Sequence, residues 1–503
     1  IVNSLDQKNE GLHTLTLLAK NLNGWKNLIK IVSKSNDHDI YYKIPRLDYS
    51  TIKDYLSDLI ILTGSPDSLL FNRLFNCDPF GIKTVEEIQS CLVNDPLEQA
   101  IDVLNLYKSL SDDVFIEISL LDRLQNPVLG FVLDIFREAA SKVALKCVAS
   151  PQSRYINPAD HIDQQILIAS SAGLTLRKAK HLFRFHKQYI PSEMELIECG
   201  HIQEELENTN LVASLCEKYS IFNKPMLPKF EWTDGLSEID YLRKLCREGY
   251  LRRKRPEWDK NVYGERAKHE LNIIENFDLA GYFLIVQDYV RWSKNQGRLV
   301  GMGRGSVNGS LVAYLSGITE IDPVLYGLLF SRFMNAGRFT KDNIEYPDID
   351  MDFPAAHRED VINYIRDRYG KERVAQICTY GQMKGAGALK EVLRVHERCS
   401  QDEMNKITKS FPQEAKIIAD LNEMEHESII QWVLENEPEK VQEWCTLKDG
   451  KLDGELSQYF AQAIRLEGTI KSQGRHASGI VVAPTNLSDI CPMIYNKGDN
   501  VIG

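Results

Sequence analysis

Residues 345 to 353 read EYPDIDMDF and place three aspartates at alternate positions. The three are Asp348, Asp350 and Asp352. Alternate side chains of an extended strand share a face, so the carboxylates are expected to project together while Ile349, Met351 and Phe353 enter a core. Clustered carboxylates repel one another unless protons or cations intervene. The pattern therefore predicts a site for a hard cation such as Mg²⁺ or Mn²⁺.

Two other interpretations of this acidic pattern remain open. One is a solvated edge strand that carries acidic side chains on its outer face. The other is a calcium loop, because Glu359 stands at the twelfth position counted from Asp348. Such a loop needs a glycine at its sixth position, where this chain has Phe353 followed by Pro354. The sequence disfavours the calcium loop and leaves the edge strand as the main alternative.

Residues 301 to 310, GMGRGSVNGS, form the most glycine-dense segment of the chain. Glycines let backbone amides approach an anion, while Arg304 and the hydroxyls of Ser306 and Ser310 add donors, so the segment predicts a cradle for a triphosphate. It lacks the Gly-Lys-Ser/Thr of a Walker A loop, and a helix rather than a strand is expected before it. Alone it is equally compatible with a simple turn. Together with the acidic motif, it favours two-metal phosphoryl chemistry.

The composition sets wider limits on the chain. At 503 residues with 43% hydrophobic residues, it has room for about three packed domains. A net charge of -11 argues against a histone-like polycation, although local patches can still bind nucleic acid. Ten cysteines without a CxxC pair indicate neither a zinc ribbon nor a disulfide framework and favour a reducing cytoplasm. Neither a membrane-length apolar run nor a signal peptide is found, and the missing initial methionine suggests a start inside a larger protein.

Strand and helix patterns alternate in the first 210 residues and indicate an α/β region. Strands are predicted at 59 to 64, 114 to 120 and 142 to 150, with a helix at 127 to 140. Farther along, an apolar helix is predicted over 281 to 297, and residues 380 to 458 are helix-rich and charged, as in an inserted subdomain. The basic run from Arg252 to Arg255 is interpreted as a solvated helix end, with a phosphate contact as the alternative.

Several of these stretches resemble the C-family DNA polymerases, the alpha subunit of bacterial DNA polymerase III. The resemblance is strongest over 281 to 383, which includes YPDIDMDF, REDVINYIRDRYG and RVAQICTYGQM, and it extends to GRHASGIVVAP at 474 to 484. The first region resembles, more weakly, the polymerase and histidinol phosphatase (PHP) domain of that family. The resemblance implies a multidomain α/β chain with four parts. They are a PHP-like α/β domain at 1 to 210, a nucleotidyltransferase-type palm at 211 to 379, an inserted helical thumb at 380 to 458, and a returning part of the palm at 459 to 503.

The resemblance also implies roles for particular residues. Asp348 and Asp350 fall on the two catalytic, metal-binding aspartates, and Asp352 on a third, supporting metal position. The implied nucleotide-binding residues are Arg304, Gly305, Ser306, Arg332, Arg338 and His476. For Arg332 an ion pair with an acid of the palm is the alternative, and for His476 a hydrogen-bonded place in the core. Lys384 and Lys390 are expected to face DNA phosphates or solvent.

The function implied is template-directed DNA synthesis, in which a primer 3'-hydroxyl attacks a bound deoxynucleotide with two Mg²⁺ or Mn²⁺ ions. Implied partners are primer-template DNA, deoxynucleoside triphosphates (dNTPs), a sliding clamp and other replisome proteins that would bind C-terminal regions missing here. A cytoplasmic, nucleoid-associated location without membrane contact is expected.

Departures from the family pattern qualify this expectation. The chain differs at Met302, Val307, Asn308 and Ser331, as expected of a divergent and perhaps phage-encoded member. The third catalytic aspartate of the family lies in a segment beyond Gly503, so we expect the chain to be inactive by itself. The PHP-like region is expected to be N-terminally incomplete and structural, because the candidate ligands do not make a recognisable set. They are His13, Glu117, Asp160 and His161. A PHP-type metal-dependent phosphoesterase and an inactive structural fragment are the alternative functions.

Overall fold

The computed structural model describes most of the chain, and its residues divide into two compact units. The described residues are 1–2, 5, 11–80, 82, 84–222, 226–334, 347–409, 411–424, 427–496 and 499–502. The first unit contains 1–219, 378–476 and 494–499, and the second contains 220–377, 477–493 and 500–503. Both units mix helices with small sheets.

A four-stranded sheet in the order β1-β2-β3-β4 forms the centre of the first unit's N-terminal part. Its strands are β1 (Thr16–Ala19), β2 (Leu59–Thr63), β3 (Val114–Ile118) and β4 (Lys146–Ala149). β1 pairs antiparallel with β2, and the other neighbours are parallel. The strands predicted at 59 to 64 and 114 to 120 are confirmed. The third begins only at Lys146, because the preceding helix runs to Val143 and Ala144 ends it in a left-handed conformation.

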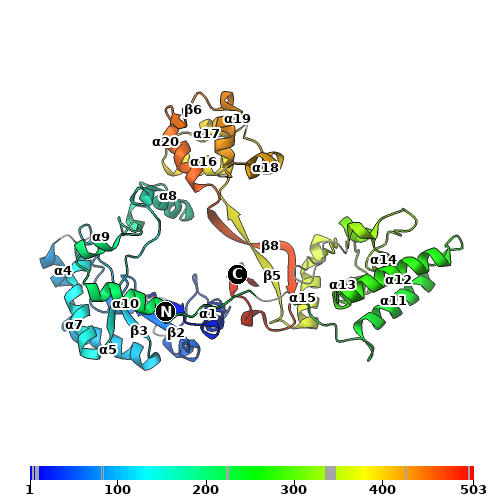
Figure 1. The fold of residues 1–503 in the computed structure, drawn as a ribbon, viewed down its shortest axis with the longest axis horizontal. Coiled ribbons are helices and arrows are strands. Elements are labelled where there is room, and N and C mark those ends of the chain that lie inside the picture. Colours follow the sequence, from blue (N-terminus) through cyan, green and yellow to red (C-terminus); the bar gives the residue numbers. More distant parts are fainter. Residues whose placement is uncertain are drawn as a thin grey trace. The chain divides into compact units, whose positions relative to one another are not determined.

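Helices cover both faces of this sheet, which explains its nearly continuous apolar strands (Figure 1). Ile61 and Ile116 face the larger cluster, which includes Phe136 of α7. Ile60 faces the other side, in a cluster with Val212 of α10. The helices of this part are α1 (Leu22–Ser35), α2 (Tyr49–Ile52), α3 (Leu69–Asn72), α4 (Val85–Cys91), α5 (Pro96–Leu110), α6 (Val128–Phe131), α7 (Leu133–Val143), α8 (His161–Ser171), α9 (Glu193–Glu198) and α10 (Gln203–Ser214). The region is a layered α/β fold, as predicted.

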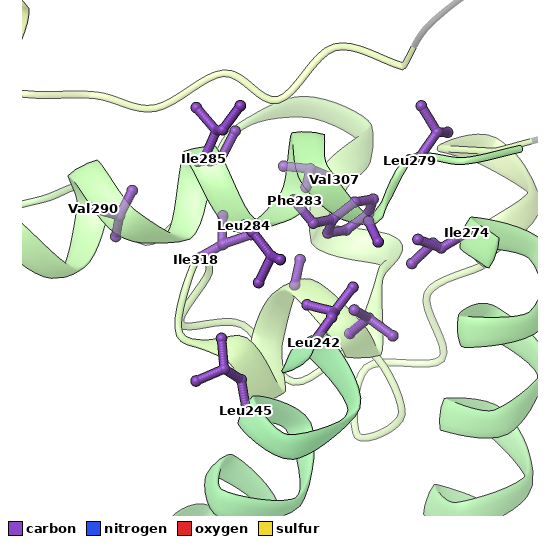
Figure 2. Close-up of a cluster of buried hydrophobic side chains, with 14 of the residues drawn as sticks. Leu242, Leu245, Ile274, Leu279, Phe283, Leu284, Ile285, Val290, Val307 and Ile318 are labelled. Atoms are coloured by element: carbon purple, nitrogen blue, oxygen red, sulfur yellow. The ribbon is translucent and has the colours of Figure 1, made fainter. Parts of the chain in front are cut away.

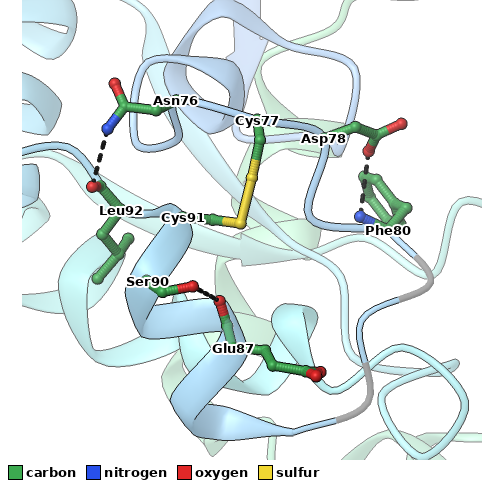
Figure 3. The surroundings of a disulfide bond; sticks show 8 residues. All are labelled: Asn76, Cys77, Asp78, Phe80, Glu87, Ser90, Cys91 and Leu92. Atoms are coloured by element: carbon green, nitrogen blue, oxygen red, sulfur yellow. Dashed lines mark hydrogen bonds between the residues drawn. A yellow bond between two sulfur atoms is a disulfide. The ribbon is translucent and has the colours of Figure 1, made fainter.

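A disulfide joins Cys77, which follows α3, to Cys91 at the end of α4 (Figure 3). The cysteine spacing indicated no disulfide framework, and this pair corrects that expectation. The two Cα atoms are 5.7 Å apart, within the range that a disulfide spans. The backbone of Asn76 also donates a hydrogen bond to the carbonyl of Cys91 over 2.7 Å, which holds the two segments together. Such proximity depends on the fold and is not encoded in cysteine spacing.

A second helical cluster of the first unit is built from residues 385 to 466. Its elements are α16 (Gly385–Val395), α17 (Gln401–Thr408), α18 (Glu414–Asn422), α19 (Ile429–Asn436), β6 (Thr446–Lys448), β7 (Lys451–Asp453) and α20 (Ser457–Leu466). Ile166 and Ala169 of α8 join the apolar core of this cluster. Asp163 of α8 also accepts two hydrogen bonds from Arg465, at 2.6 and 2.9 Å. α8 therefore packs with a segment that lies far from it in the sequence.

Glu391 of α16 forms a polar contact between the helical cluster at 385 to 466 and α8. Its carboxylate is buried and accepts hydrogen bonds from Ser170 at 2.7 Å and from Arg394, and it pairs with Lys471 at 2.9 Å. Burial alone works to raise the pKa of Glu391, but the hydrogen bonds from Arg394, Lys471 and Ser170 outweigh it and lower the pKa to about 2.

We expect the first unit to lose stability in acid through Glu391. Its folded-state pKa lies below the ordinary value of 4.5, so its contribution is present above that pH and is lost as the pH falls toward 2. The loss amounts to at most about 3 kcal/mol. Denaturant unfolding between pH 7 and pH 3 measures it. A Glu391→Gln variant is expected to have a shallower acid slope than the parent, and an equal slope would contradict the prediction.

Among its described residues, the second unit packs five α-helices around one core. They are α11 (Glu238–Arg253), α12 (Lys260–Asn276), α13 (Ala280–Asn295), α14 (Leu311–Ser316) and α15 (Arg358–Tyr369). Figure 2 shows Leu242 and Leu245 of α11 beside Phe283 and Leu284 of α13, with Val307 and Ile318 from the segments flanking α14. The apolar helix predicted at 281 to 297 is confirmed as α13. Gly297 follows it with a positive φ of 70°, which glycine adopts without strain.

A second four-stranded sheet has the order β8-β5-β10-β9. Its strands are β5 (Val374–Gln382), β8 (Ile470–Val482), β9 (Met493–Asn496) and β10 (Asp499–Ile502). Most of the motif GRHASGIVVAP at 474 to 484 lies within β8. Among the helices that the structure describes, none is both long and apolar enough to cross a bilayer.

Candidate active site

The acidic segment of the second unit is extended, and its side chains alternate as predicted. Asp348, Asp350 and Asp352 are exposed. Ile349, Met351 and Phe353 pack against the core. The segment is not a regular strand, however, because its only described pairing is an isolated bridge between Asp350 and Arg304. It thus lacks the ladder of the edge strand considered above.

The acidic segment contacts the glycine loop directly. The amide of Gly301 donates a hydrogen bond to the carbonyl of Asp352 over 2.9 Å. The backbones of Arg304 and Asp350 also pair in the isolated antiparallel β-bridge. The approach at Gly301 is so close that an added Cβ would lie 2.9 Å from the Cβ of Asp352. The two motifs, which the sequence analysis paired only by inference, lie side by side.

Tyr282 of α13 fixes the segment from the core side. Its hydroxyl accepts a hydrogen bond from the amide of Ile349 at 3.1 Å. Burial raises the pKa of Tyr282 to about 12, and the charges of Asp348 and Asp350 add to the shift. The hydroxyl therefore stays protonated at neutral pH. The sequence analysis missed this residue, whose signal is a tyrosine within an otherwise apolar helix face.

The glycine loop turns through a short 3-10 helix, η4 (Gly305–Gly309), before α14 begins. Gly303 and Gly305 have positive φ angles of 113° and 72°. At Gly303 an added Cβ would lie 2.3 Å from Oδ1 of Asn308, whereas at Gly305 nothing lies within 4 Å. The backbone at Gly305 is therefore open to a ligand, as a phosphate cradle requires.

Glu270 of α12 holds the loop from behind. Its fully buried carboxylate accepts hydrogen bonds from Ser310 Oγ at 2.9 Å, from the amide of Val312 at 3.0 Å and from Arg266 Nε at 2.6 Å. Arg266 also donates to the carbonyl of Gly309 at 2.8 Å. Burial raises the pKa of Glu270, and these hydrogen bonds oppose the rise.

This network corrects the role expected of Ser310 and adds two residues, Glu270 and Arg266, to the candidate site. Ser310 was expected to offer its hydroxyl to an anion, but the side chain is fully buried and caps α14 instead. Glu270 and Arg266 were not singled out from the sequence. Their signal was a carboxylate at helical spacing between Tyr263 and Ile274, with an arginine four residues before it.

The predicted nucleotide-binding residues are distributed unevenly. Arg304, Gly305 and Ser306 are exposed on the loop. Arg332 is exposed at the end of η5 (Phe330–Arg332), which packs against η4. Arg338 lies outside the described residues. His476 is exposed on β8 and belongs to the first unit. Four of the six predicted residues thus belong to the loop or to the element packed against it.

The carboxylates differ in their surroundings. The side chains of Asp348 and Asp350 have no hydrogen bond or ion pair with any described residue. Asp352 faces Arg304 at 3.7 Å, and both side chains are about two-thirds exposed, at 65% and 67%. An exposed pair at that distance is weak, so an anion can compete for Arg304. Within the described part of the chain, no group of three or more His, Cys, Asp or Glu side chains is gathered as a ready-made metal site.

Two of the four candidate ligands of the PHP-like region have partners within that region. Glu117 is buried on β3 and accepts hydrogen bonds from Ser150 at 2.9 Å and Gln152 at 3.2 Å. Asp160 accepts from the amide of Asn157 at 2.9 Å. Burial raises the pKa of Glu117, although both side-chain hydrogen bonds work against the rise. The carboxylates of Glu117 and Asp160 thus form hydrogen bonds within the fold.

A Gly301→Ala variant tests the contact between the two motifs. The new methyl group would meet the Cβ of Asp352, so we expect the acidic segment to shift and the stability to fall by about 1–3 kcal/mol. Gly264→Ala on α12 is the matched control, because nothing lies within 4 Å of its Cβ position. Denaturant unfolding of both variants measures the difference. Equal stability of the two would contradict the close approach.

Comparison with known proteins identifies the family. The model of the bacterial DNA polymerase III alpha NTPase domain matches residues 240–502, more than half of the chain. The chain belongs to the bacterial DNA polymerase III alpha family. The PHP domain model matches residues 3–119. The resemblance inferred from the sequence is therefore confirmed for both regions.

Curated relatives named DNA polymerase III subunit alpha agree with this assignment. The Aquifex aeolicus protein is 30% identical over 518 residues, which cover 97% of this chain and 41% of the relative. The Rickettsia bellii protein is 33% identical over 513 residues, covering 97% and 40%. The Pseudomonas aeruginosa protein is 30% identical over 501 residues, covering 97% and 39%. The chain thus spans about two fifths of the length of these relatives.

Proposed function

We propose that this chain carries the nucleotide-binding and metal-binding part of a DNA-directed DNA polymerase. The observation that supports the proposal most is the direct contact between the glycine loop and the acidic segment, through Gly301 and Asp352 and through Arg304 and Asp350. A nucleotidyl transferase needs groups that bind the nucleotide phosphates close to carboxylates that would hold divalent ions, because such ions would offset the charge of those phosphates. Membership of the polymerase III alpha family makes DNA synthesis the reaction that fits this arrangement.

In this proposal the loop binds the phosphates of the incoming dNTP. The open backbone at Gly305 and the exposed hydroxyl of Ser306 supply donors, and Arg304 and Arg332 supply guanidinium groups. Arg338 and His476 are proposed as further nucleotide contacts from the family motif alone. Glu270 takes no part in ligand binding and fixes the loop by holding α14.

The acidic residues fit divalent cations by their chemistry. Asp348 and Asp350 present hard oxygen donors to solvent, and no described cation pairs with them. We propose that they bind two Mg²⁺ or Mn²⁺ ions, with Asp352 in a supporting position. Ions held by these carboxylates would supply Lewis-acid activation of a primer hydroxyl and charge stabilisation for the leaving pyrophosphate. The chain's own contribution is to hold the two carboxylates beside the phosphate donors before substrate arrives.

The wider assignments are part of the same proposal. Residues 1–210 are proposed as a structural PHP-like domain, 211–379 and 459–503 as the palm, and 380–458 as the thumb. Primer-template DNA, dNTPs, a sliding clamp and other replisome proteins are the proposed partners, in the bacterial cytoplasm at the nucleoid. The support is the family match and, for the PHP-like domain, the structural engagement of Glu117 and Asp160.

Primer extension in an elongation-competent preparation tests the proposal. Product should form only with Mg²⁺ or Mn²⁺, and chelation should stop it. Arg332→Gln is expected to raise the KM for dNTP by about tenfold or more, because a charge-assisted contact to phosphate is lost. Arg358→Gln, an exposed arginine at the start of α15, is the control and should leave KM unchanged. Extension that persists without divalent ions would reject the proposal.

A further inference from the structure

A basic cavity lies in the second unit, at the opposite end of α14 from the glycine loop. It has a volume of about 430 Å³ and is lined by residues of α11 and α13 and by the C-terminal end of α14. Its basic side chains are Arg252, Arg253, Arg291 and Lys294, and its acidic ones are Glu248 and Glu320. The run from Arg252 to Arg255, which the sequence analysis interpreted as a solvated helix end, thus contributes two of its members to a concave surface.

Close packing of α11 on α14 places these side chains together. An added Cβ at Gly249 of α11 would lie 1.8 Å from the carbonyl oxygen of Leu315, so only glycine permits this approach. One turn later, a guanidinium nitrogen of Arg252 lies 3.7 Å from the Cβ position at Gly317, where α14 ends. Arg291 reaches the same cavity from α13.

Two of the four cations already share one acidic partner, Glu320. Glu320 accepts from Arg253 at 2.7 Å and from Lys294 at 2.6 Å, and Lys294 also donates to the carbonyl of Gly317 at 2.8 Å. Burial works to raise the pKa of Glu320, but the hydrogen bonds from Arg253 and Lys294 lower it below its usual range. Glu320 therefore remains charged and holds both cations in place.

The other two cations have no such partner. Neither Arg252 nor Arg291 forms an ion pair with a carboxylate in the part of the chain that the structure describes. Gln287 also lines the cavity with only 8% of its surface exposed, and its side chain has no hydrogen bond to a described residue. Its amide N–H groups are therefore available to a ligand that accepts hydrogen bonds.

We propose that this cavity binds a phosphate-bearing ligand, with Arg252 and Arg291 as its charged contacts and Gln287 as a neutral donor. Two guanidinium groups from different helices match the oxygens of a phosphate or diphosphate group. No aromatic ring lines the cavity, so the recognition is of phosphate and not of a base. The volume exceeds that of one phosphate and lies in the range of ligand pockets. The source is a free nucleotide or pyrophosphate, or the backbone of a nucleic acid.

Arginine modification by phenylglyoxal, followed by peptide mass mapping, tests this site in the full chain. The probes are inorganic pyrophosphate, a dNTP and a single-stranded oligonucleotide, each compared with no addition. Arg252 and Arg291 are expected to be protected, whereas Arg247, exposed on the same helix α11 and outside the cavity, should react at an unchanged rate. Protection by pyrophosphate or dNTP identifies a free phosphate ligand, and protection by the oligonucleotide alone identifies a nucleic-acid backbone.

The experiment separates this site from the glycine loop, because the peptides that contain Arg304 and Arg332 report on the loop independently. A variant with both Arg252→Gln and Arg291→Gln is expected to bind the protecting probe about tenfold or more weakly at this site, while Arg247→Gln binds it like the parent. Absence of protection at Arg252 and Arg291 by all three probes would overturn the proposal. Unchanged binding by the double variant would do the same.

Discussion

Replacing Asp348 or Asp350 with asparagine is expected to lower the kcat of primer elongation by at least about 100-fold. Asparagine keeps the volume of the side chain and removes its charge, so the extended segment should keep its place against the glycine loop while its affinity for divalent cations falls. Affinity for primed DNA is expected to stay nearly constant. Steady-state elongation and a DNA-binding titration, in an elongation-competent preparation, measure the two quantities.

Asp367→Asn provides the matched control for this experiment. Asp367 is exposed on α15 and pairs weakly with Lys371 at 3.8 Å, so its loss should leave elongation unchanged. Asp352→Asn should be less harmful than either main variant, because Asp352 faces Arg304. Full elongation by the Asp348→Asn variant would remove that residue from the metal site. An equal loss in Asp367→Asn would indicate a general effect of charge.

A Glu270→Ala variant is expected to lose about 3–5 kcal/mol of stability, the usual cost of leaving one member of a buried ion pair alone. Arg266 would keep its charge without a carboxylate, and Ser310 Oγ and the amide of Val312 would lose their acceptor. Because these groups define the start of α14, we expect the glycine loop to loosen and the KM for dNTP to rise. Denaturant unfolding and hydrogen exchange at Val312 measure the effect.

Glu265→Ala distinguishes this network from a general loss of charge on α12. Glu265 is exposed on the same helix and should change the stability by no more than about 0.5 kcal/mol. Glu270→Gln keeps the shape of the side chain and some of its hydrogen bonds. Its loss of stability should therefore fall between those of Glu265→Ala and Glu270→Ala. If amide exchange at Val312 were as slow in Glu270→Ala as in Glu265→Ala, the network would not be what holds α14.

The elements that the sequence predicts well are those whose own residues determine their burial. The strands β2 and β3 are short apolar runs, and α13 is an apolar helix that stops before Gly297. The sequence also predicts which side chains of the acidic segment are buried. Polar and apolar residues alternate there, so Asp350 is exposed while the residues on either side of it pack against the core. The contact of this segment with the glycine loop could be inferred only from chemistry, since the two motifs are separated by α14 and the residues after it.

The features that escaped prediction depend on partners that the fold, and no local sequence pattern, brings together. Glu270 looks like any charged residue of α12 until α14 covers it, and the pairing of Cys77 with Cys91 follows from where α3 and α4 end. The packing of α8 with α16 and α20 joins residues more than 200 positions apart, as the hydrogen bond from Ser170 to Glu391 shows. No local pattern in either segment indicates the other.

The internal cap on α14 has a consequence for how the glycine loop can vary. Glu270 and Arg266 hold the loop through Gly309, Ser310 and Val312, none of which faces solvent. Met302, on the outer rim of the loop, is 66% exposed and contributes nothing to that frame through its side chain. Exposed residues of the loop can therefore be substituted, by evolution or by design for altered nucleotides, while the Glu270 and Arg266 network keeps the backbone of the loop in the same shape.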